Sequence, residues 1–269
     1  MRWLPFLAGG AVVGAGVLTY GCLVGSKQLV REDYKLRLPR WPKRLDGFRI
    51  AVLADFHLRD KYSRELVDRA IMMALDASPD MVVLAGDFVA YWKESSIQEL
   101  GEALEPLLLM QGNVVAIPGN HEYWAGSPEF LRPVLEELSI KYLENEAWVH
   151  AGIRWVGIDS FISGRPDPVA AYADQMGHDP TIVLWHEPDW VELVPDGAAL
   201  MISGHTHGGQ FRFPGGFTPM YTKGGRRFPR GFYPDASTPL FVTRGVGTTG
   251  PPSRLNCKPE VAILELHPA

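Results

Sequence analysis

The stretch Arg49-Ile-Ala-Val-Leu-Ala-Asp55-Phe-His57 joins a near-continuous apolar run to an acid and a histidine. Similar apolar runs follow at 81–85 and 114–117, and stretches with helical spacing of apolar residues lie between them at 63–76 and 96–110. Near-continuous apolar strands are typical of parallel sheets that are covered on both faces. Because strands alternate with helices here, the first half of the chain is predicted to contain βαβ units.

The second half of the chain contains more strand-like runs and fewer helical ones. A third helix is predicted to begin at Ser127-Pro128, with the proline in its first turn. The later apolar runs are 148–149, 154–158, 182–185, 200–202, 240–243 and 261–266. We expect the later strands to pair in a more antiparallel manner. The chain as a whole is predicted to be a layered α/β fold.

Polar residues directly follow five of these strand-like runs. They are Asp55-Phe-His57, Gly86-Asp87, Gly119-Asn120-His121-Glu122, His186 and Gly204-His205-Thr-His207. A single acid in such a place more often caps the next helix, and a single histidine more often belongs to the core. Ligands of open α/β sheets bind beyond the carboxyl ends of the strands, so five such groups together indicate one site.

The chemistry of these side chains indicates metal binding. Imidazole, carboxylate and amide oxygen form a mixed set of donors suited to Mn, Fe, Zn or Ni, and their number exceeds the need of one ion. Two ions about 3.5–4 Å apart can bind a phosphoryl group and generate a hydroxide between them. A histidine that binds no metal could then protonate the leaving group.

In this order, the five motifs resemble those of the calcineurin-like metallophosphoesterases, over about residues 48–266. The strings Gly204-His-Thr-His-Gly-Gly-Gln210 and Thr243-Arg-Gly-Val-Gly247, with the tail 254–261, are similar to the bacterial membrane-associated phosphodiesterase branch. The resemblance implies a four-layer αββα sandwich. It also implies two divalent or transition-metal ions as cofactors, with Mn preferred and Fe, Zn, Ni or Mg as alternatives.

The resemblance further implies a ligand trio for each ion and one bridging carboxylate. The first trio is Asp55, His57 and His207, the second is Asn120, His186 and His205, and the bridge is Asp87. His121 would be the catalytic acid or charge stabiliser, oriented by Glu122, where many members of the family have aspartate. We expect hydrolysis of a phosphodiester or pyrophosphate by in-line attack of a metal-bridging hydroxide, because no nucleophile motif such as Gly-x-Ser-x-Gly is present.

The N-terminal segment, residues 1–26, is predicted to be a membrane anchor. From Leu4 to Val24 there are 21 residues without a charge, which is about the length that spans a bilayer as a helix. A cleaved signal peptide, or a lipoprotein modified at Cys22, are the alternatives. The segment 27–47 is predicted to be a basic linker before a catalytic domain at 48–269. The positive-inside rule then favours a single-pass protein of the bacterial inner (cytoplasmic) membrane with its catalytic domain on the cytoplasmic side.

Charge is unevenly distributed along the 269 residues. Residues 1–44, 45–210 and 211–269 carry +6, −16 and +5, which sum to −5. The acidic middle block argues against nucleic acid as a partner. Two cysteines exclude a disulfide framework.

The segment 211–233 has 5 basic residues, 7 aromatic residues and no acid. It could meet anionic lipid headgroups and hold an apolar substrate tail, or it could pack on the domain as an ordinary loop. Likewise, Arg244 and Arg254 could contact phosphate or be structural.

An anchored phosphoesterase suggests a substrate at the membrane. The sharpest candidate is a nucleotide lipid such as UDP-2,3-diacylglucosamine, because other membrane-linked members of the superfamily hydrolyse it. The alternatives are a broad-specificity phosphodiesterase on non-lipid substrates and a non-catalytic metal-binding membrane adaptor. A metal-dependent amidohydrolase would be expected to open with His-x-His rather than with Asp55-x-His57.

Overall fold

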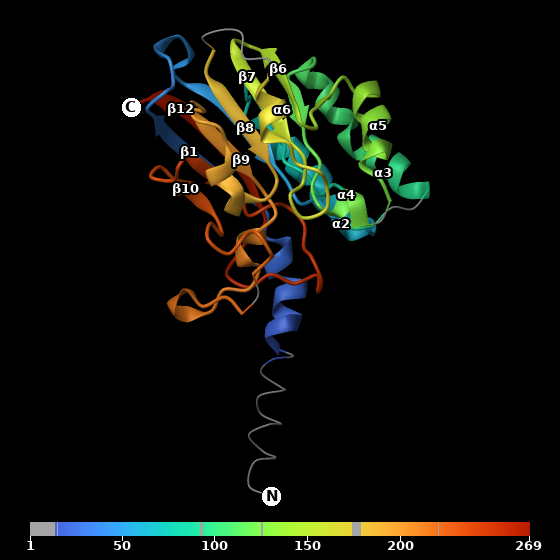
Figure 1. The fold of residues 1–269 in the computed structure, drawn as a ribbon. Helices are drawn as coiled ribbons and strands as arrows, with labels where there is room; N and C mark the ends of the chain where they lie inside the picture. Colours follow the sequence, from blue (N-terminus) through green and yellow to red (C-terminus); the bar gives the residue numbers. More distant parts are fainter. Residues whose placement is uncertain (1–13, 15, 92–93, 125, 174–178, 220) are drawn as a thin grey trace, which may run out of the picture.

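Two six-stranded sheets form the centre of the protein (Figure 1). The computed structural model describes residues 14, 16–91, 94–124, 126–173, 179–219 and 221–269. One apolar core contains side chains from both sheets, among them Val52, Val83, Trp155 and Ile202. This core shows that the sheets pack against each other, so the predicted layered α/β fold is confirmed.

The first sheet has the strand order β1-β12-β2-β3-β4-β5. Its strands are β1 Val30–Leu38, β2 Phe48–Leu53, β3 Met81–Leu84, β4 Val114–Ala116, β5 Lys141–Tyr142 and β12 Glu260–Pro268. Strands β2 to β5 run parallel, as the apolar runs predicted, and β12 pairs antiparallel with β2. The carboxyl ends of β2, β3 and β4 therefore lie at one edge.

Helices cover the outer face of this sheet. They are α2 Lys61–Asp76, α3 Glu94–Leu104, η3 Glu105–Met110, η4 Pro128–Phe130 and α5 Leu131–Glu137. Helix α2 begins where Asp60 accepts a hydrogen bond from the backbone N–H of Ser63 at 2.8 Å, which is a capping box. Its apolar stripe, which includes Leu66 and Ile71, is buried against the sheet.

The second sheet has the order β10-β11-β9-β8-β7-β6. Its strands are β6 Glu146–His150, β7 Ile153–Ile158, β8 Thr181–Trp185, β9 Leu200–Ser203, β10 Gly231–Tyr233 and β11 Leu240–Val242. The expectation of more antiparallel pairing among the later strands holds in part. Strand β6 pairs antiparallel with β7, β10 with β11 and β12 with β2, whereas β7, β8, β9 and β11 run parallel. These strands are buried along their whole length, as parallel strands covered on both faces usually are. The outer face carries α6 Pro168–Tyr172 and η5 Pro188–Leu193.

Residues 27–47 differ from the expected linker. Strand β1 lies within this segment and pairs parallel with β12. Leu36, Leu38 and Trp41 are buried in the core between the sheets. From Tyr34 onward, apolar residues that face the core alternate with exposed basic residues, and the basic residues made the segment resemble a linker. Because β1 pairs with β12, the segment is part of the first sheet.

Most of the predicted anchor, residues 4–13 and 15, lies outside the described residues. The described residues 16–23 are helical, and the carbonyl oxygen of Gly21 accepts a hydrogen bond from the backbone N–H of Arg254 at 3.2 Å. In the part of the chain that the structure describes, no helix is both long enough and apolar enough to span a bilayer.

Candidate functional site

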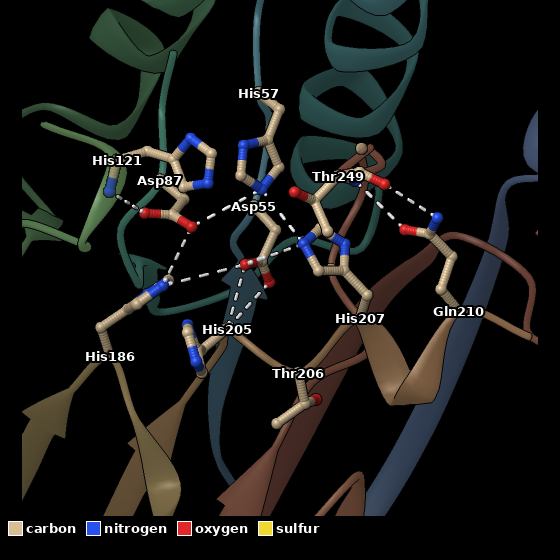
Figure 2. A network of polar contacts seen from close by, with 12 residues as sticks. Asp55, His57, Asp87, His121, His186, His205, Thr206, His207, Gln210 and Thr249 are labelled. Carbon is tan, nitrogen blue, oxygen red and sulfur yellow. Dashed lines mark hydrogen bonds and ion pairs between the residues drawn. The ribbon is translucent and has the colours of Figure 1, made fainter. Parts of the chain in front are cut away.

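The two sheets bring the predicted metal ligands together at one edge (Figure 2). Asp55, Asp87 and Asn120 lie just beyond β2, β3 and β4, and His186 and His205 lie just beyond β8 and β9. All seven predicted ligands are buried, the most exposed being His205 at 5%. Parallel pairing within each sheet aligns the strand ends, so ligands far apart in the sequence meet in space.

The first trio gathers around two facing imidazoles. The Nε2 atoms of His57 and His207 are 3.1 Å apart, and Nε2 of His207 is 3.7 Å from Oδ1 of Asp55. Ligand atoms of these three residues all lie within 4.8 Å of one another. Two imidazole lone pairs this close repel each other unless a proton or a cation lies between them. The trio therefore suits a cation.

Asp87 lies between the two trios. Its Oδ2 atom is 3.2 Å from Nε2 of His186 and 3.5 Å from Nε2 of His57. Its Oδ1 atom accepts a hydrogen bond from the backbone N–H of His121 at 2.9 Å, which fixes the carboxylate (Figure 2). A ligand shared by two ions would need this position.

Backbone carbonyls hold two of the histidines in orientations suited to metal binding. Nδ1 of His186 donates to the carbonyl oxygen of Ala85 at 2.6 Å, and Nε2 of His205 donates to that of Lys223 at 2.8 Å. Each bond leaves the other ring nitrogen free for a metal, as is usual for metal-binding histidines.

Asn120, the third predicted ligand of the second trio, lies in the same cavity wall as His205. Its Oδ1 atom is buried and lacks a hydrogen-bond partner among the described residues. A buried amide oxygen without a partner is costly unless a cation or water satisfies it. The residues present therefore fit a pair of divalent cations.

The electrostatics of the site favour positive charge. Burial, with repulsion from the Asp87 carboxylate, raises the pKa of Asp55 to about 7. Burial also lowers the pKa of His57 to about 3, so this imidazole is neutral and able to bind a metal. Although burial acts against it, the carboxylates of Asp87 and Asp55 hold the pKa of His186 well above its usual range. Cations placed among these groups would remove the repulsion between the two carboxylates.

The backbone of the ligand segments is strained. Asp55, His57, Asp87, His205 and His207 all have φ between +46° and +72°. Residues other than glycine rarely adopt this left-handed region, and each instance costs about 1–3 kcal/mol. Such strain at five of the seven ligands indicates that the fold holds them in place for function.

Two glycines allow the strand ends to approach each other. Gly86 has φ +88°, and a Cβ atom there would lie 2.7 Å from the backbone nitrogen of Gly119 and 2.7 Å from Nδ1 of His186. A Cβ atom at Gly119 would collide with the Asp87 carboxylate. Both positions need glycine because neighbouring backbone and ligand atoms occupy the space of a side chain.

His121 lies at the rim of the site, at the start of the short helix α4 His121–Trp124. Its Nδ1 atom is 3.2 Å from the carbonyl oxygen of Ala90, and its ring lies 4.4 Å from those of His57 and Trp124. It is partly exposed, unlike the predicted metal ligands. A partly exposed imidazole beside buried ligands is placed to reach a bound substrate.

Glu122 points into the protein below the site. Its carboxylate accepts hydrogen bonds from the backbone N–H groups of Gly119, Phe88 and Asp87 at 2.7, 2.8 and 3.0 Å. Burial, and next the charge of Asp87, raise the pKa of Glu122 to about 7. The observed bonds tie the turn after β3 to the turn after β4, a support for the site that the sequence did not predict.

A cavity of about 190 Å³ opens over the predicted ligands. Its wall contains Asp87, Asn120, His121, His205 and His207. It also contains residues that the sequence did not single out: Trp124, Ile162, Thr222, Lys223 and Thr249. Thr222 and Lys223 belong to the 211–233 loop, whose position directly after His207 was the signal that could have placed them here.

Arg244 and Arg254 are structural in this arrangement. Arg254 is completely buried and donates to carbonyl oxygens, among them those of Gly247 and Arg244. Arg244 pairs with Glu260 at 2.9 Å. The alternative of phosphate contact is thus not supported by where their side chains point.

Known proteins resemble this chain. The family described as calcineurin-like phosphoesterase matches residues 48–209. A protein named Phosphodiesterase YaeI, from Escherichia coli (strain K12), is 31% identical over 260 residues, which cover 94% of this chain and 93% of that protein. A Danio rerio protein named Transmembrane protein with metallophosphoesterase domain is 27% identical over 286 residues, covering 96% of this chain and 62% of its own length. The crystal structure of a dimetal phosphatase from Danio rerio aligns with a TM-score of 0.46 at 14% identity, covering 77% of this chain and 90% of that one.

Proposed function

The chain belongs to the calcineurin-like phosphoesterase family and is a metal-dependent phosphoric ester hydrolase, and we propose that it cleaves phosphodiester or pyrophosphate bonds with two divalent ions, Mn foremost. The observation that carries this proposal is the place of Asp87, whose Oδ2 atom lies 3.2 and 3.5 Å from a histidine of each trio. Bound cations would neutralise the charge of a diester and acidify a water molecule.

The residues around the ions would bind the diester and hold its protons. His121 lies at the cavity wall with Asn120 and Lys223. In this proposal its imidazolium donates a proton to the leaving oxygen, which lowers the barrier to P–O cleavage. Glu122 supports the turn that carries His121 by its bonds to Gly119 and Phe88.

We further propose that the chain is held at the inner membrane by residues 4–24, within the GHTHGGQ-type, membrane-associated branch of the family. The 21 uncharged residues of this segment support an anchor. The name of the Danio rerio relative, a transmembrane protein with a metallophosphoesterase domain, is consistent with it. The basic residues from Lys27 to Arg44 favour a cytoplasmic catalytic domain.

The proposed substrate is a diester that lies at the membrane, with a nucleotide lipid such as UDP-2,3-diacylglucosamine as one candidate. A broader phosphodiesterase that acts on soluble diesters is the second candidate. The name of the Escherichia coli relative, a phosphodiesterase, is compatible with both.

A substrate panel tests the proposal. The purified full chain, treated with EDTA and reloaded with Mn²⁺, is assayed with bis(p-nitrophenyl) phosphate, p-nitrophenyl phosphate and UDP-2,3-diacylglucosamine. We expect Mn²⁺-dependent cleavage of the diester that exceeds cleavage of the monoester. Release of UMP from the nucleotide lipid would identify that substrate. A chain that binds Mn²⁺ but cleaves none of the three would be a metal-binding adaptor, and the proposal would be wrong.

A further inference from the structure

A surface groove of about 680 Å³ is lined by residues 217–219, 221–224 and 226, next to the predicted metal cavity. Thr222 and Lys223 line both the groove and the cavity. The groove and the cavity are therefore neighbours on the surface, with Thr222 and Lys223 between them. A ligand with its phosphate among the metal ligands could continue along the groove without leaving the surface.

The groove is lined by apolar rings and cations. Phe217 and Tyr221 are 64% and 43% exposed and line the same hollow. Exposed apolar side chains that gather at one place, rather than lie scattered, are typical of binding surfaces. Lys223 and Arg226 are exposed beside them, and the 211–233 segment has no acid. An anionic ligand with an apolar arm matches this combination, because the cations attract its phosphate and the rings cover its arm.

The groove wall is fixed to the domain. The carboxylate of Asp189 accepts hydrogen bonds from the backbone N–H groups of Arg226 and Arg227 at 3.0 Å. Within the loop, the backbone N–H of Phe213 donates to the carbonyl oxygen of Phe217 at 2.9 Å, and the next residue, Thr218, is buried. The carbonyl oxygen of Lys223 also holds the metal ligand His205. The groove is thus a preformed surface joined to the site.

The loop that lines the groove lies at the same end of the molecule as the N-terminal helical segment (Figure 1). The segment 249–257 connects them through hydrogen bonds. On one side, the backbone N–H of Arg212 donates to the carbonyl oxygen of Leu255 at 2.9 Å. On the other, the hydroxyl of Ser253 donates to the carbonyl oxygen of Leu18 at 3.3 Å. The end of the predicted anchor and the groove therefore share one support.

We infer that the groove binds the apolar, non-leaving arm of a lipid-linked phosphodiester whose phosphate occupies the metal cavity. Continuity with the cavity, the charge of its wall and its place beside the predicted anchor favour this occupant. The inference rests on the proposed phosphodiesterase function and adds the residues that select the substrate.

The test compares two diesters that differ only in the non-leaving arm. The full chain in phosphatidylcholine vesicles is assayed with methyl p-nitrophenyl phosphate and with octyl p-nitrophenyl phosphate, which share charge and leaving group. For the native chain we expect kcat/KM to be about tenfold or more higher for the octyl diester. Phe217→Ser should lower the octyl-to-methyl ratio by about tenfold, through KM, whereas Phe217→Leu, which keeps an apolar side chain, should retain it.

Val169→Ser is the matched control, since Val169 is 76% exposed on α6, away from the groove. It should leave the ratio unchanged, and each variant should keep the native unfolding midpoint. If Phe217→Ser unfolds, Tyr221→Ser replaces it. A native chain that cleaves both diesters equally, or a groove variant that keeps the octyl preference, overturns the inference and leaves the phosphodiesterase function intact. Cleavage of neither diester overturns that function itself.

Discussion

At the scale of single residues, His121 and Glu122 are neighbours with different surroundings. The ring of His121 reaches the cavity wall, and the carboxylate of Glu122 is completely buried and binds backbone N–H groups. Within one motif, His121 therefore has the proposed catalytic role and Glu122 supports the surrounding backbone. Each role leads to its own prediction.

We predict that His121→Ala lowers kcat by about 10²–10⁴ for a diester with an alkyl leaving group, because that oxygen needs a proton. With p-nitrophenolate as leaving group the loss should be much smaller. Steady-state kinetics with both diesters measures the difference, and the ion content of the variant is the control. An equal loss with both leaving groups would contradict the role of acid.

We predict that Glu122→Ala lowers the free energy of unfolding by about 3 kcal/mol, since it leaves several buried N–H groups without an acceptor. Denaturant unfolding measures the loss. Glu137→Ala, at the exposed end of α5, is the control and should change stability by less than about 0.5 kcal/mol. A Glu122 variant as stable as this control would refute the supporting role.

At the scale of elements, the turns after the strands hold the ligands. The turn after β4 passes so close to Asp87 that Gly119 has no room for a Cβ atom. Five ligands lie at positive φ in such turns. Asp and His adopt this backbone region more readily than most residues, and the surrounding structure holds them in it.

We predict that Gly119→Ala displaces Asp87 and lowers kcat/KM by about 10–100-fold. Diester kinetics and Mn²⁺ affinity measure the effect. The control is Gly101→Ala within α3, where the new Cβ atom would meet only Val134 Cγ1 at 3.7 Å. Alanine favours a helix interior by about 1 kcal/mol, so this control should stay active and be at least as stable. Comparable activity of the two variants would contradict the close fit at Gly119.

Much of the fold could be predicted from the sequence because buried parallel strands leave long apolar runs. The runs at 49–54 and 182–185 correspond to β2 and β8. Strand direction in the second sheet could not be predicted, because an apolar run does not show which strand it pairs with or in which direction. Strand β1 was missed because one of its faces is charged and its partner β12 is more than 200 residues away.

The residues gathered at the metal site were proposed from the order of five motifs. The structure places all seven proposed ligands at one edge, but only the three-dimensional fold could add Lys223 or Trp124 to the cavity wall. Trp124 lies two residues after the motif 119–122 and Lys223 lies in the loop that follows His207, but neither residue is itself part of a motif. The support given by Glu122 likewise depends on two turns that are more than 30 residues apart.

At the scale of the whole molecule, the site joins the two sheets. Asp55 and Asp87, which follow β2 and β3, face His186 and His205, which follow β8 and β9 (Figure 2). The carboxylates of Asp55 and Asp87, both from the first sheet, repel each other in a buried place, and the predicted ligands of the second sheet are imidazoles. Cations there would therefore hold the sheets together as well as bind substrate.

We predict that EDTA lowers the thermal unfolding midpoint by about 5–10 °C relative to the protein with Mn²⁺ at about 100 times its dissociation constant. Mn²⁺ should restore the midpoint. Differential scanning calorimetry measures the shift, and Ca²⁺, which prefers oxygen ligands, is the control ion and should restore less. An unchanged midpoint after complete metal removal would refute this link between the sheets.

The most direct test of the dinuclear site measures diesterase rate against bound Mn²⁺ per chain. Mn²⁺ is added back to the EDTA-treated full chain, and the ions retained are counted by mass spectrometry. We predict that the rate rises until two ions are bound per chain. The variant Asp87→Asn should retain fewer than two ions per chain, and its kcat/KM should fall by at least about 100-fold. Asp76→Asn, at the exposed end of α2, should match the native chain. Full rate at one ion per chain, or native activity in Asp87→Asn, would contradict a site built around a bridging Asp87.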